Sequence, residues 1–303
     1  MSPIRVSLGW KRLLRDAGLV IGLSALVLLL YDIGWAWNYS YGLLHAACIG
    51  DRASLAERGF ASDAVTFHSR AGPLLRGWFA RGSDHPDIAI VVVAGQASNT
   101  RYALDDAEIM ARSGFSTLIY ENRACADPPL EASTGYWESY DLLGAVDYLK
   151  ARPDIHHVGV WGFSAGGTAS LLAAPQDPAI EAVVAMGGYS SLKADIVDED
   201  QNLRPLDWLG RRFIVVAMGI QLGVPVEASS PIDHVAGISP RPLFLIYGEY
   251  EAGNGRALYA AANQPKQLWI VPGAGHGGYL AAAPDEYRAR VPAFFNQAFG
   301  LSK

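Results

Sequence analysis

The pattern of hydrophobic and polar positions divides the chain into two unlike parts. The first 40 residues contain one long apolar run, whereas short apolar runs alternate with helical spacing from residue 62 onward. The short runs predict strands, and apolar residues three or four positions apart predict helices. We expect strands at 65–67, 75–79, 88–93, 116–120, 157–161, 182–186, 243–247 and 267–271. We expect helices at 102–112, 136–152, 167–174 and 284–299.

This order of elements predicts an α/β fold. The continuous apolar run at 88–93 is typical of a strand buried on both faces. Strands that alternate with helices predict right-handed crossovers and a mostly parallel sheet covered by helices on both sides. The first two strands are expected to form an antiparallel pair. We assign residues 41–61 to a linker and residues 62–303 to this domain.

The N-terminal segment combines a basic flank with the apolar run. The run from Ala17 to Tyr31 is 15 residues long, is interrupted by Asp32 and continues to Trp37. A helix of about 20 apolar residues spans a bilayer, so residues 1–40 are expected to form a single-pass signal anchor that contacts the membrane. The basic residues before the run are Arg5, Lys11, Arg12 and Arg15, and the aromatic residues suited to the far interface are Trp35, Trp37, Tyr39 and Tyr41.

Two alternatives to the anchor stay open, a cleaved signal and a buried core helix. A cleaved signal would need a small-residue site soon after the run, and residues 31–35 fit such a site poorly. Residues 44–48 have the outline of a lipoprotein cleavage site, although His45 stands where an aliphatic residue is expected. The run could also form a buried core helix. With an anchor, the basic flank stays in the cytoplasm, which places residues 40–303 on the non-cytoplasmic side.

Composition limits the classes of function. The 303 residues are 50% hydrophobic and 18% charged, which suits one large packed domain with an appendage. The net charge is −6, and the sequence has no basic patch with interleaved aromatic residues, so we do not expect nucleic-acid binding. Cys48 and Cys125 lack metal-ligand spacing, and we interpret them as two thiols, with a bridge as the alternative if the domain is exported. The sequence predicts neither a metal nor a cofactor and does not determine the oligomeric state.

The segment 162–166, Gly-Phe-Ser-Ala-Gly, carries the strongest chemical signal. It lies between a predicted strand and a predicted helix. In a G-x-S-x-G turn the small residues allow the backbone to turn sharply, so that the serine hydroxyl is exposed above the sheet. Ser164 is therefore the candidate nucleophile of an acyl-transfer reaction.

A serine nucleophile needs a base, and the base needs an acid to orient it. In α/β-type serine hydrolases the triad follows the chain order serine, acid, histidine, so the base should lie well after Ser164. Only His234 and His276 meet this condition. His276 lies in a glycine-rich loop after the last strand and is the predicted base, whereas His234 is expected to be structural. Glu251 is the preferred acid because of its spacing from the preceding strand. The alternatives for the acid are Glu249, Asp233, Asp195 and Asp198.

An oxyanion that develops in the reaction needs backbone N–H donors. The amide of Ala165, directly after the nucleophile, is the first expected donor. The second should come from the loop after the strand at 88–93, where we choose Gln96. The Gln96 side chain could instead cap the following helix.

These motifs together resemble the α/β-hydrolase superfamily, in particular its single-domain esterases, dienelactone-hydrolase-like proteins and serine aminopeptidase-like proteins. The resemblance covers roughly residues 62–300. Residues 94–96 stand where the family has His-Gly-x, residues 121–123 where it has Asp-x-Arg-Gly, and residues 230–235 and 238–242 resemble the run before the acid-bearing strand. Ala94 in place of the histidine puts the support of the oxyanion loop in question, and glutamate replaces the commoner aspartate as the acid.

The resemblance implies a serine hydrolase that cleaves carboxylic esters of small-molecule substrates through a Ser-Glu-His triad. A peptidase, thioesterase or acyltransferase would use the same triad, and a non-catalytic binding protein could share the fold. Residues 198–231 fall where this fold often carries a small cap. Their apolar run at 213–220 could line an acyl pocket or dip toward a membrane, and the alternative is a helix packed on the sheet.

Overall fold

Eight strands form one sheet in the order β1-β2-β4-β3-β5-β6-β7-β8. The structure, a computed structural model, describes residues 7–198 and 205–301. β2 runs antiparallel to β1 and β4, and the strands from β3 to β8 pair in parallel. The strands are β1 Ser62–His68, β2 Leu74–Ala80, β3 His85–Val93, β4 Phe115–Tyr120, β5 His157–Phe163, β6 Ile180–Met186, β7 Leu243–Gly248 and β8 Lys266–Val271. The predicted fold class is confirmed.

Helices cover both faces of this sheet. One face carries α2 (Leu104–Arg112) and α9 (Pro284–Ala298), and the other carries α3 (Tyr136–Lys150), α4 (Ala165–Ala173) and α7 (Ala252–Ala261). Helix α7 was not predicted from the sequence, because Gly253, Asn254 and Gly255 lower its intrinsic helix propensity. Three further helices are α5 (Leu192–Asp198), α6 (Pro205–Leu222) and α8 (Tyr279–Ala282).

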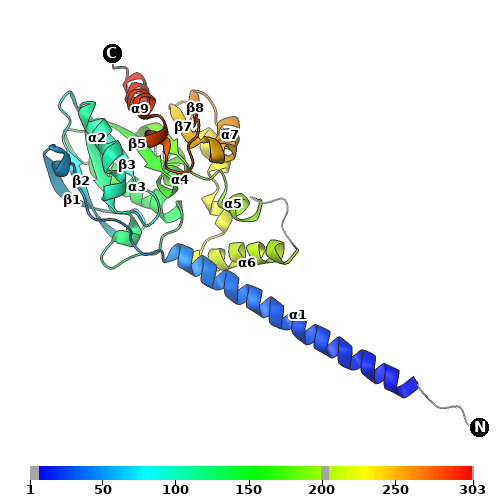
Figure 1. Cartoon of the computed structure of the whole chain (residues 1–303). Helices are drawn as coiled ribbons and strands as arrows, with labels where there is room; N and C mark the ends of the chain where they lie inside the picture. Colours follow the sequence, from blue (N-terminus) through cyan, green and yellow to red (C-terminus); the bar gives the residue numbers. More distant parts are fainter. Residues whose placement is uncertain (1–6, 199–204, 302–303) are drawn as a thin grey trace, which may run out of the picture.

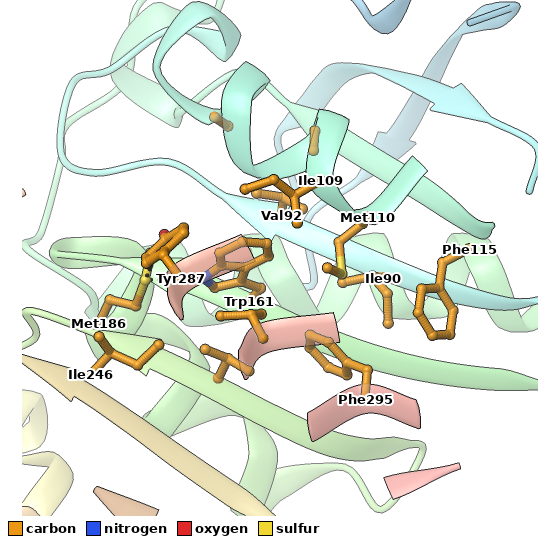
Figure 2. Packing of buried hydrophobic residues seen from close by; sticks show 14 of the residues in the cluster. Ile90, Val92, Ile109, Met110, Phe115, Trp161, Met186, Ile246, Tyr287 and Phe295 are labelled. Atoms are coloured by element: carbon orange, nitrogen blue, oxygen red, sulfur yellow. Dashed lines mark hydrogen bonds between the residues drawn. The ribbon is translucent and has the colours of Figure 1, made fainter. Parts of the chain in front are cut away.

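The side chains of β3 show how the sheet divides the core. Ile90 and Val92 point into the cluster beneath α2 and α9, whereas Val91 points into the cluster beneath α3 and α4. Figure 2 shows the first cluster, in which Trp161 packs against Tyr287 of α9. Burial on both faces explains why the strand is apolar at every position from 88 to 93.

A long helix, α1 (Ser7–Leu44), projects from the body (Figure 1). Its segment Gly9–Leu44 is long and apolar enough to cross a membrane, with a mean hydropathy of 2.1 over its most apolar window. None of that window is buried within the molecule, which argues against the alternative of a core helix. A signal sequence near the N-terminus meets the same criteria of length and hydropathy. Arg5 of the predicted basic flank lies outside the described residues.

The C-terminal end of α1 is joined firmly to the body. Cys48 and Cys125 form a disulfide, so the interpretation of two free thiols is wrong. The Leu44 carbonyl accepts a hydrogen bond from the Ala132 amide, and the Ile49 amide donates to the Ala97 carbonyl. The bridge was not predictable, because the two cysteines are 77 residues apart and the fold alone brings them together.

Helix α6 covers the end of α1 rather than the sheet. Ser40 Oγ of α1 lies 3.0 Å from Gln221 Oε1 of α6, and Gln221 Nε2 donates to the Trp37 carbonyl at 3.1 Å. Leu44 packs in a buried cluster with Met218 and Leu222. The expectation of a helix packed on the sheet is therefore wrong for the 213–220 run. Residues 199–204 of the predicted cap lie outside the described residues.

Candidate active site

Ser164 lies at the turn from β5 to α4 in a strained backbone conformation. Its φ of 54° and ψ of −120° are unusual for a residue with a side chain. The flanking glycines are required by close approach. A Cβ on Gly162 would lie 2.1 Å from the Gly166 carbonyl oxygen, and a Cβ on Gly166 would lie 2.4 Å from the Val93 carbonyl oxygen. These contacts give the G-x-S-x-G pattern its physical basis.

The structure brings the three residues predicted for acyl transfer into one hydrogen-bonded chain. His276 Nε2 lies 3.0 Å from Ser164 Oγ. His276 Nδ1 lies 2.7 Å from Glu251 Oε2. Both distances are those of good hydrogen bonds. With the proton on Nδ1, the ring donates to the carboxylate and leaves Nε2 free to accept the serine proton.

Glu251 is held by two further donors on its other oxygen. The Tyr279 hydroxyl donates to Oε1, and the Gly248 amide donates to the same atom at 3.2 Å. Burial works to raise the pKa of Glu251, but the hydrogen bonds from His276, Tyr279 and Gly248 together hold this pKa below its usual value. The side chain is only 18% exposed. Glu251 is therefore an ionised, oriented partner for the imidazole at neutral pH.

The other candidate acids have different places. Glu249 Oε2 accepts the Gly273 amide at 2.8 Å, so this carboxylate supports the turn that leads to His276. Asp195 lines the cavity beside Ser164 and accepts a hydrogen bond from Asn254 at 3.3 Å. Asp233 ends a short 3-10 segment before β7, His234 follows it in a turn, and both are exposed. The side chain of Asp198 lies outside the described residues.

The two expected oxyanion donors flank the nucleophile. Ala165 is the first residue of α4, and Gln96 lies in the loop after β3; both line the cavity with Ser164. That loop lies close to the nucleophile, since a Cβ on Gly95 would be 3.4 Å from Ser164 Cβ. The Gln96 side chain does not cap the next helix. Instead its amide donates to the carbonyl of Leu43 in α1.

The loop after β3, called the oxyanion loop here for its expected donor, has its own support in place of a histidine at position 94. The Ile49 amide donates to the Ala97 carbonyl at 2.7 Å, and the Asn99 amide donates to the Ile49 carbonyl at 2.9 Å. The neighbouring Cys48–Cys125 bridge attaches the same segment to the region after β4. The chain that follows α1 therefore braces this loop, which answers the question that Ala94 raised.

The motif at 121–123 is structural. Arg123 makes a two-pronged ion pair with Asp141 of α3, at 2.8 and 3.0 Å, and both side chains are buried. The Asn122 side chain accepts the Ala124 amide. Glu121 is also buried and pairs with Arg52. These contacts fix the loop after β4 against α3, beneath the site.

A cavity of about 640 Å³ opens beside Ser164. Its walls come from the oxyanion loop, the histidine and acid loops, α5 and α6, and also from α1. Three residues of α1 contribute: Trp35, Tyr39 and Leu43. Their spacing of four residues places them on one face of the helix. The other lining residues are Gln96, Thr134, Ser164, Ala165, Gly187, Tyr189, Leu192, Asp195, Ile196, Arg211, Ile214, Tyr250, Glu251, Asn254 and His276.

Sequence reasoning missed two contributions to the site. Tyr279, the first residue of α8, holds Glu251, and its position three residues after His276 was a usable signal. The α1 residues Trp35 and Tyr39 were assigned only to a membrane interface, and nothing in the local pattern indicates that they also line the cavity.

Comparison with known proteins agrees with this fold. The sequence profile of the Prolyl oligopeptidase family matches residues 129–302. The uncharacterized protein PA2218 of Pseudomonas aeruginosa is 25% identical over 228 residues, covering 56% of this chain and 62% of that protein. The uncharacterized protein YfhR of Escherichia coli O157:H7 is 24% identical over 251 residues, covering 79% of this chain and 82% of YfhR.

Among solved structures, the esterase Pf2001 of Pyrococcus furiosus superimposes with a TM-score of 0.65 at 20% identity, covering 82% of this chain and 97% of that one. At this identity the likeness concerns the fold. The family match extends over more than half of the chain, including Ser164, Glu251 and His276. The chain belongs to the prolyl oligopeptidase family and is a serine hydrolase of the α/β-hydrolase type.

Proposed function

We propose that this protein cleaves carboxylic esters with a triad of Ser164, His276 and Glu251. The observation that carries the proposal is the position of His276, whose two ring nitrogens lie 3.0 Å from Ser164 Oγ and 2.7 Å from Glu251 Oε2. A hydroxyl, an imidazole and an ionised carboxylate in this order are the parts that acyl transfer requires. Apolar side chains from α1, α5 and α6 line part of the cavity and can hold the acyl chain of an ester, beside two charged lining residues, Asp195 and Arg211.

The reaction follows from these contacts. His276 Nε2 takes the proton of Ser164 as Oγ forms a bond to the ester carbonyl carbon, and Glu251 stabilises the imidazolium. The amides of Ala165 and Gln96 are the proposed donors to the resulting oxyanion. When the carbon–oxygen bond of the ester breaks, His276 gives its proton to the departing alcohol. A water then attacks the acyl-enzyme by the same route, releases a carboxylic acid and restores Ser164.

We further propose that α1 anchors the protein in a membrane, with the hydrolase domain on the non-cytoplasmic side. The basic residues before the apolar window support this orientation through the positive-inside rule. The Cys48–Cys125 disulfide suits an oxidising compartment. A protease-accessible C-terminal tag on spheroplasts is the expected result, and a tag protected there but cleaved after lysis would refute the orientation.

The test of the activity is a matched substrate panel with the full-length protein. An acetate ester, the corresponding thioester and a peptide amide of prolyl type would be compared for the wild type, Ser164→Ala and His276→Ala. We expect the ester to be the best substrate and both variants to lose at least about 10³ in kcat. Faster cleavage of the peptide, as the family name suggests, would replace the ester proposal with a peptidase. Equal turnover by Ser164→Ala and the wild type would refute the proposed triad.

A further inference from the structure

The residues that α1 contributes to the active-site cavity belong to the candidate membrane helix. Trp35, Tyr39 and Leu43 belong to the same continuous helix as the exposed apolar segment. Leu19, Val20 and Ile21 in that segment are each about two-thirds exposed, at 66, 65 and 69%. One helix therefore provides both the candidate anchor and part of the substrate site.

The length of α1 determines where these cavity-lining residues would lie relative to the bilayer. From Arg15 to Trp35 the helix rises by about 30 Å at 1.5 Å per residue, which equals the thickness of the hydrocarbon core of a bilayer. From Trp35 to Leu43 it rises by a further 12 Å or so, which crosses the headgroup region on that side, about 5–8 Å thick, and extends just beyond it. The cavity would then begin at the edge of the hydrocarbon. The aromatic residues Trp35 and Tyr39 are of the kind that prefers this level.

Helix α6 continues the same surface. Its inner side packs on α1, as the Ser40–Gln221 contact shows, and its Ile214 lines the cavity. Its outer side carries an exposed stripe at four-residue spacing, in which Trp208, Val216 and Ile220 are 47, 58 and 63% exposed. Arg212 lies at the same spacing between Trp208 and Val216, is half-buried, and stacks over the Trp208 ring at 3.6 Å. A helix with apolar residues, a tryptophan and an arginine on its free side suits the plane of a membrane interface.

The attachment of α1 to the body keeps this arrangement in place. The Gln96 side chain joins the oxyanion loop to the Leu43 carbonyl, and the Cys48–Cys125 disulfide joins the chain just after α1 to the hydrolase domain. The His45 ring also lies 3.0 Å from Glu131. Because the helix and the site are joined at these points, the cavity cannot turn freely away from the bilayer in which the helix is set.

We propose that the substrates are long-chain acyl esters resident in the same bilayer, which reach Ser164 past the end of α1 and along α6. This inference rests on the proposed esterase function and on the anchor. The acyl chain would lie against Trp35, Tyr39 and Ile214, with the ester carbonyl toward Ser164 and the oxyanion loop. The bond changes are those already described for the ester.

A comparison of substrate in the same vesicle and in separate vesicles tests this directly. The full chain would be reconstituted in phosphatidylcholine vesicles with a 4-methylumbelliferyl ester of a long-chain fatty acid in the same membrane. In the second arrangement, the same amount of ester would be supplied in protein-free vesicles. We expect an initial rate at least ten-fold higher for ester in the enzyme's own membrane. Equal rates, without vesicle fusion, would overturn the proposal.

A soluble ester separates this inference from the function on which it rests. Hydrolysis of 4-methylumbelliferyl acetate that depends on Ser164, together with equal rates in the two vesicle arrangements, would overturn only the membrane route. If neither the acetate nor the long-chain ester is hydrolysed by the folded protein, the esterase function and the route that depends on it both fail.

Surface variants test the part played by α6. The double variant Val216→Asp, Ile220→Asp changes two exposed positions and should lower the same-vesicle to separate-vesicle rate ratio at least five-fold. Leu74→Asp is the matched control, because Leu74 is 52% exposed on β2, outside α1 and α6. Trp35→Ala should lower the ratio of kcat/KM for the long-chain ester to kcat/KM for the acetate. Wild-type ratios in both the double variant and Trp35→Ala would contradict the proposed route.

Discussion

Replacement of Glu251 by glutamine should move the proton of the neutral His276 ring from Nδ1 to Nε2. Oε1 of Glu251 accepts hydrogen bonds from the Tyr279 hydroxyl and the Gly248 amide. In Glu251→Gln these donors hold the amide oxygen at the same place, so the amide nitrogen must face His276 Nδ1. That nitrogen can only donate. Nδ1 then becomes an acceptor, Nε2 carries the proton, and the ring cannot take the proton of Ser164.

The expected loss is large because the change affects the tautomer. An acid-to-amide change of this kind in a serine protease triad lowers kcat by about 10⁴. At about 1.36 kcal/mol for each factor of ten, this corresponds to about 5.4 kcal/mol of transition-state stabilisation. KM for the soluble ester should change little, since Glu251 lies behind the histidine.

Glu249→Gln is the matched control in the same loop. Glu249 accepts the Gly273 amide, and a glutamine oxygen can still accept it, so kcat should stay within about three-fold of the wild type. The assay is kcat for 4-methylumbelliferyl acetate, with the melting temperature of each variant to show that it is folded. A folded Glu251→Gln protein with kcat within ten-fold of the wild type, or an equal loss of kcat in Glu249→Gln, would show that the Glu251 carboxylate does not set the tautomer of His276.

Three further predictions concern the surroundings of the triad. Tyr279→Phe removes one donor from Glu251 but leaves the Gly248 amide, so kcat should fall about ten-fold with KM unchanged, since a hydrogen bond to a charged group contributes about 1.5–3 kcal/mol; an unchanged kcat would exclude this positioning role. Replacing both Cys48 and Cys125 with serine should lower the free energy of unfolding by about 2–5 kcal/mol in denaturant titrations and abolish its sensitivity to reductant; a wild type insensitive to reductant would contradict the bridge. Burial raises the pKa of Asp106 to about 7 despite its hydrogen bond from Tyr287. The folded state is therefore increasingly destabilised as pH rises from about 4 to 7, because the unfolded chain ionises this carboxyl group first. The melting temperature of Asp106→Asn, relative to that of the wild type, should therefore be higher at pH 8 than at pH 5. The same difference in melting temperature at both pH values would exclude this destabilisation.

The sequence predicted the sheet well because its strands carry strong local signals. The run at 88–93 is apolar at each position because both faces of β3 are covered, and the same burial makes β5 and β7 recognisable. Helix α7 was missed because its glycines and asparagine oppose helix formation locally, whereas packing against Tyr247 and β8 holds it in place. Tertiary contacts outweigh propensity in such a segment.

The candidate site was predictable where chemistry imposes residue order. Ser164 and His276 stand in distinctive glycine-rich turns, and the spacing after β7 favoured Glu251 over Glu249. The role of α1 in the cavity was not predictable, because it depends on how α6 packs across the end of that helix. The disulfide was left open for the same reason, since only the fold brings Cys48 beside Cys125.

The most direct test of the central claim is covalent trapping of the nucleophile. The full-length protein would be treated with a fluorophosphonate probe, and the modified peptide would be identified by mass spectrometry beside Ser164→Ala and His276→Ala. We expect a single adduct on Ser164, absent in Ser164→Ala and formed far more slowly in His276→Ala. A folded wild-type protein that gives no adduct, or an adduct that persists in Ser164→Ala, would show that Ser164 is not the nucleophile.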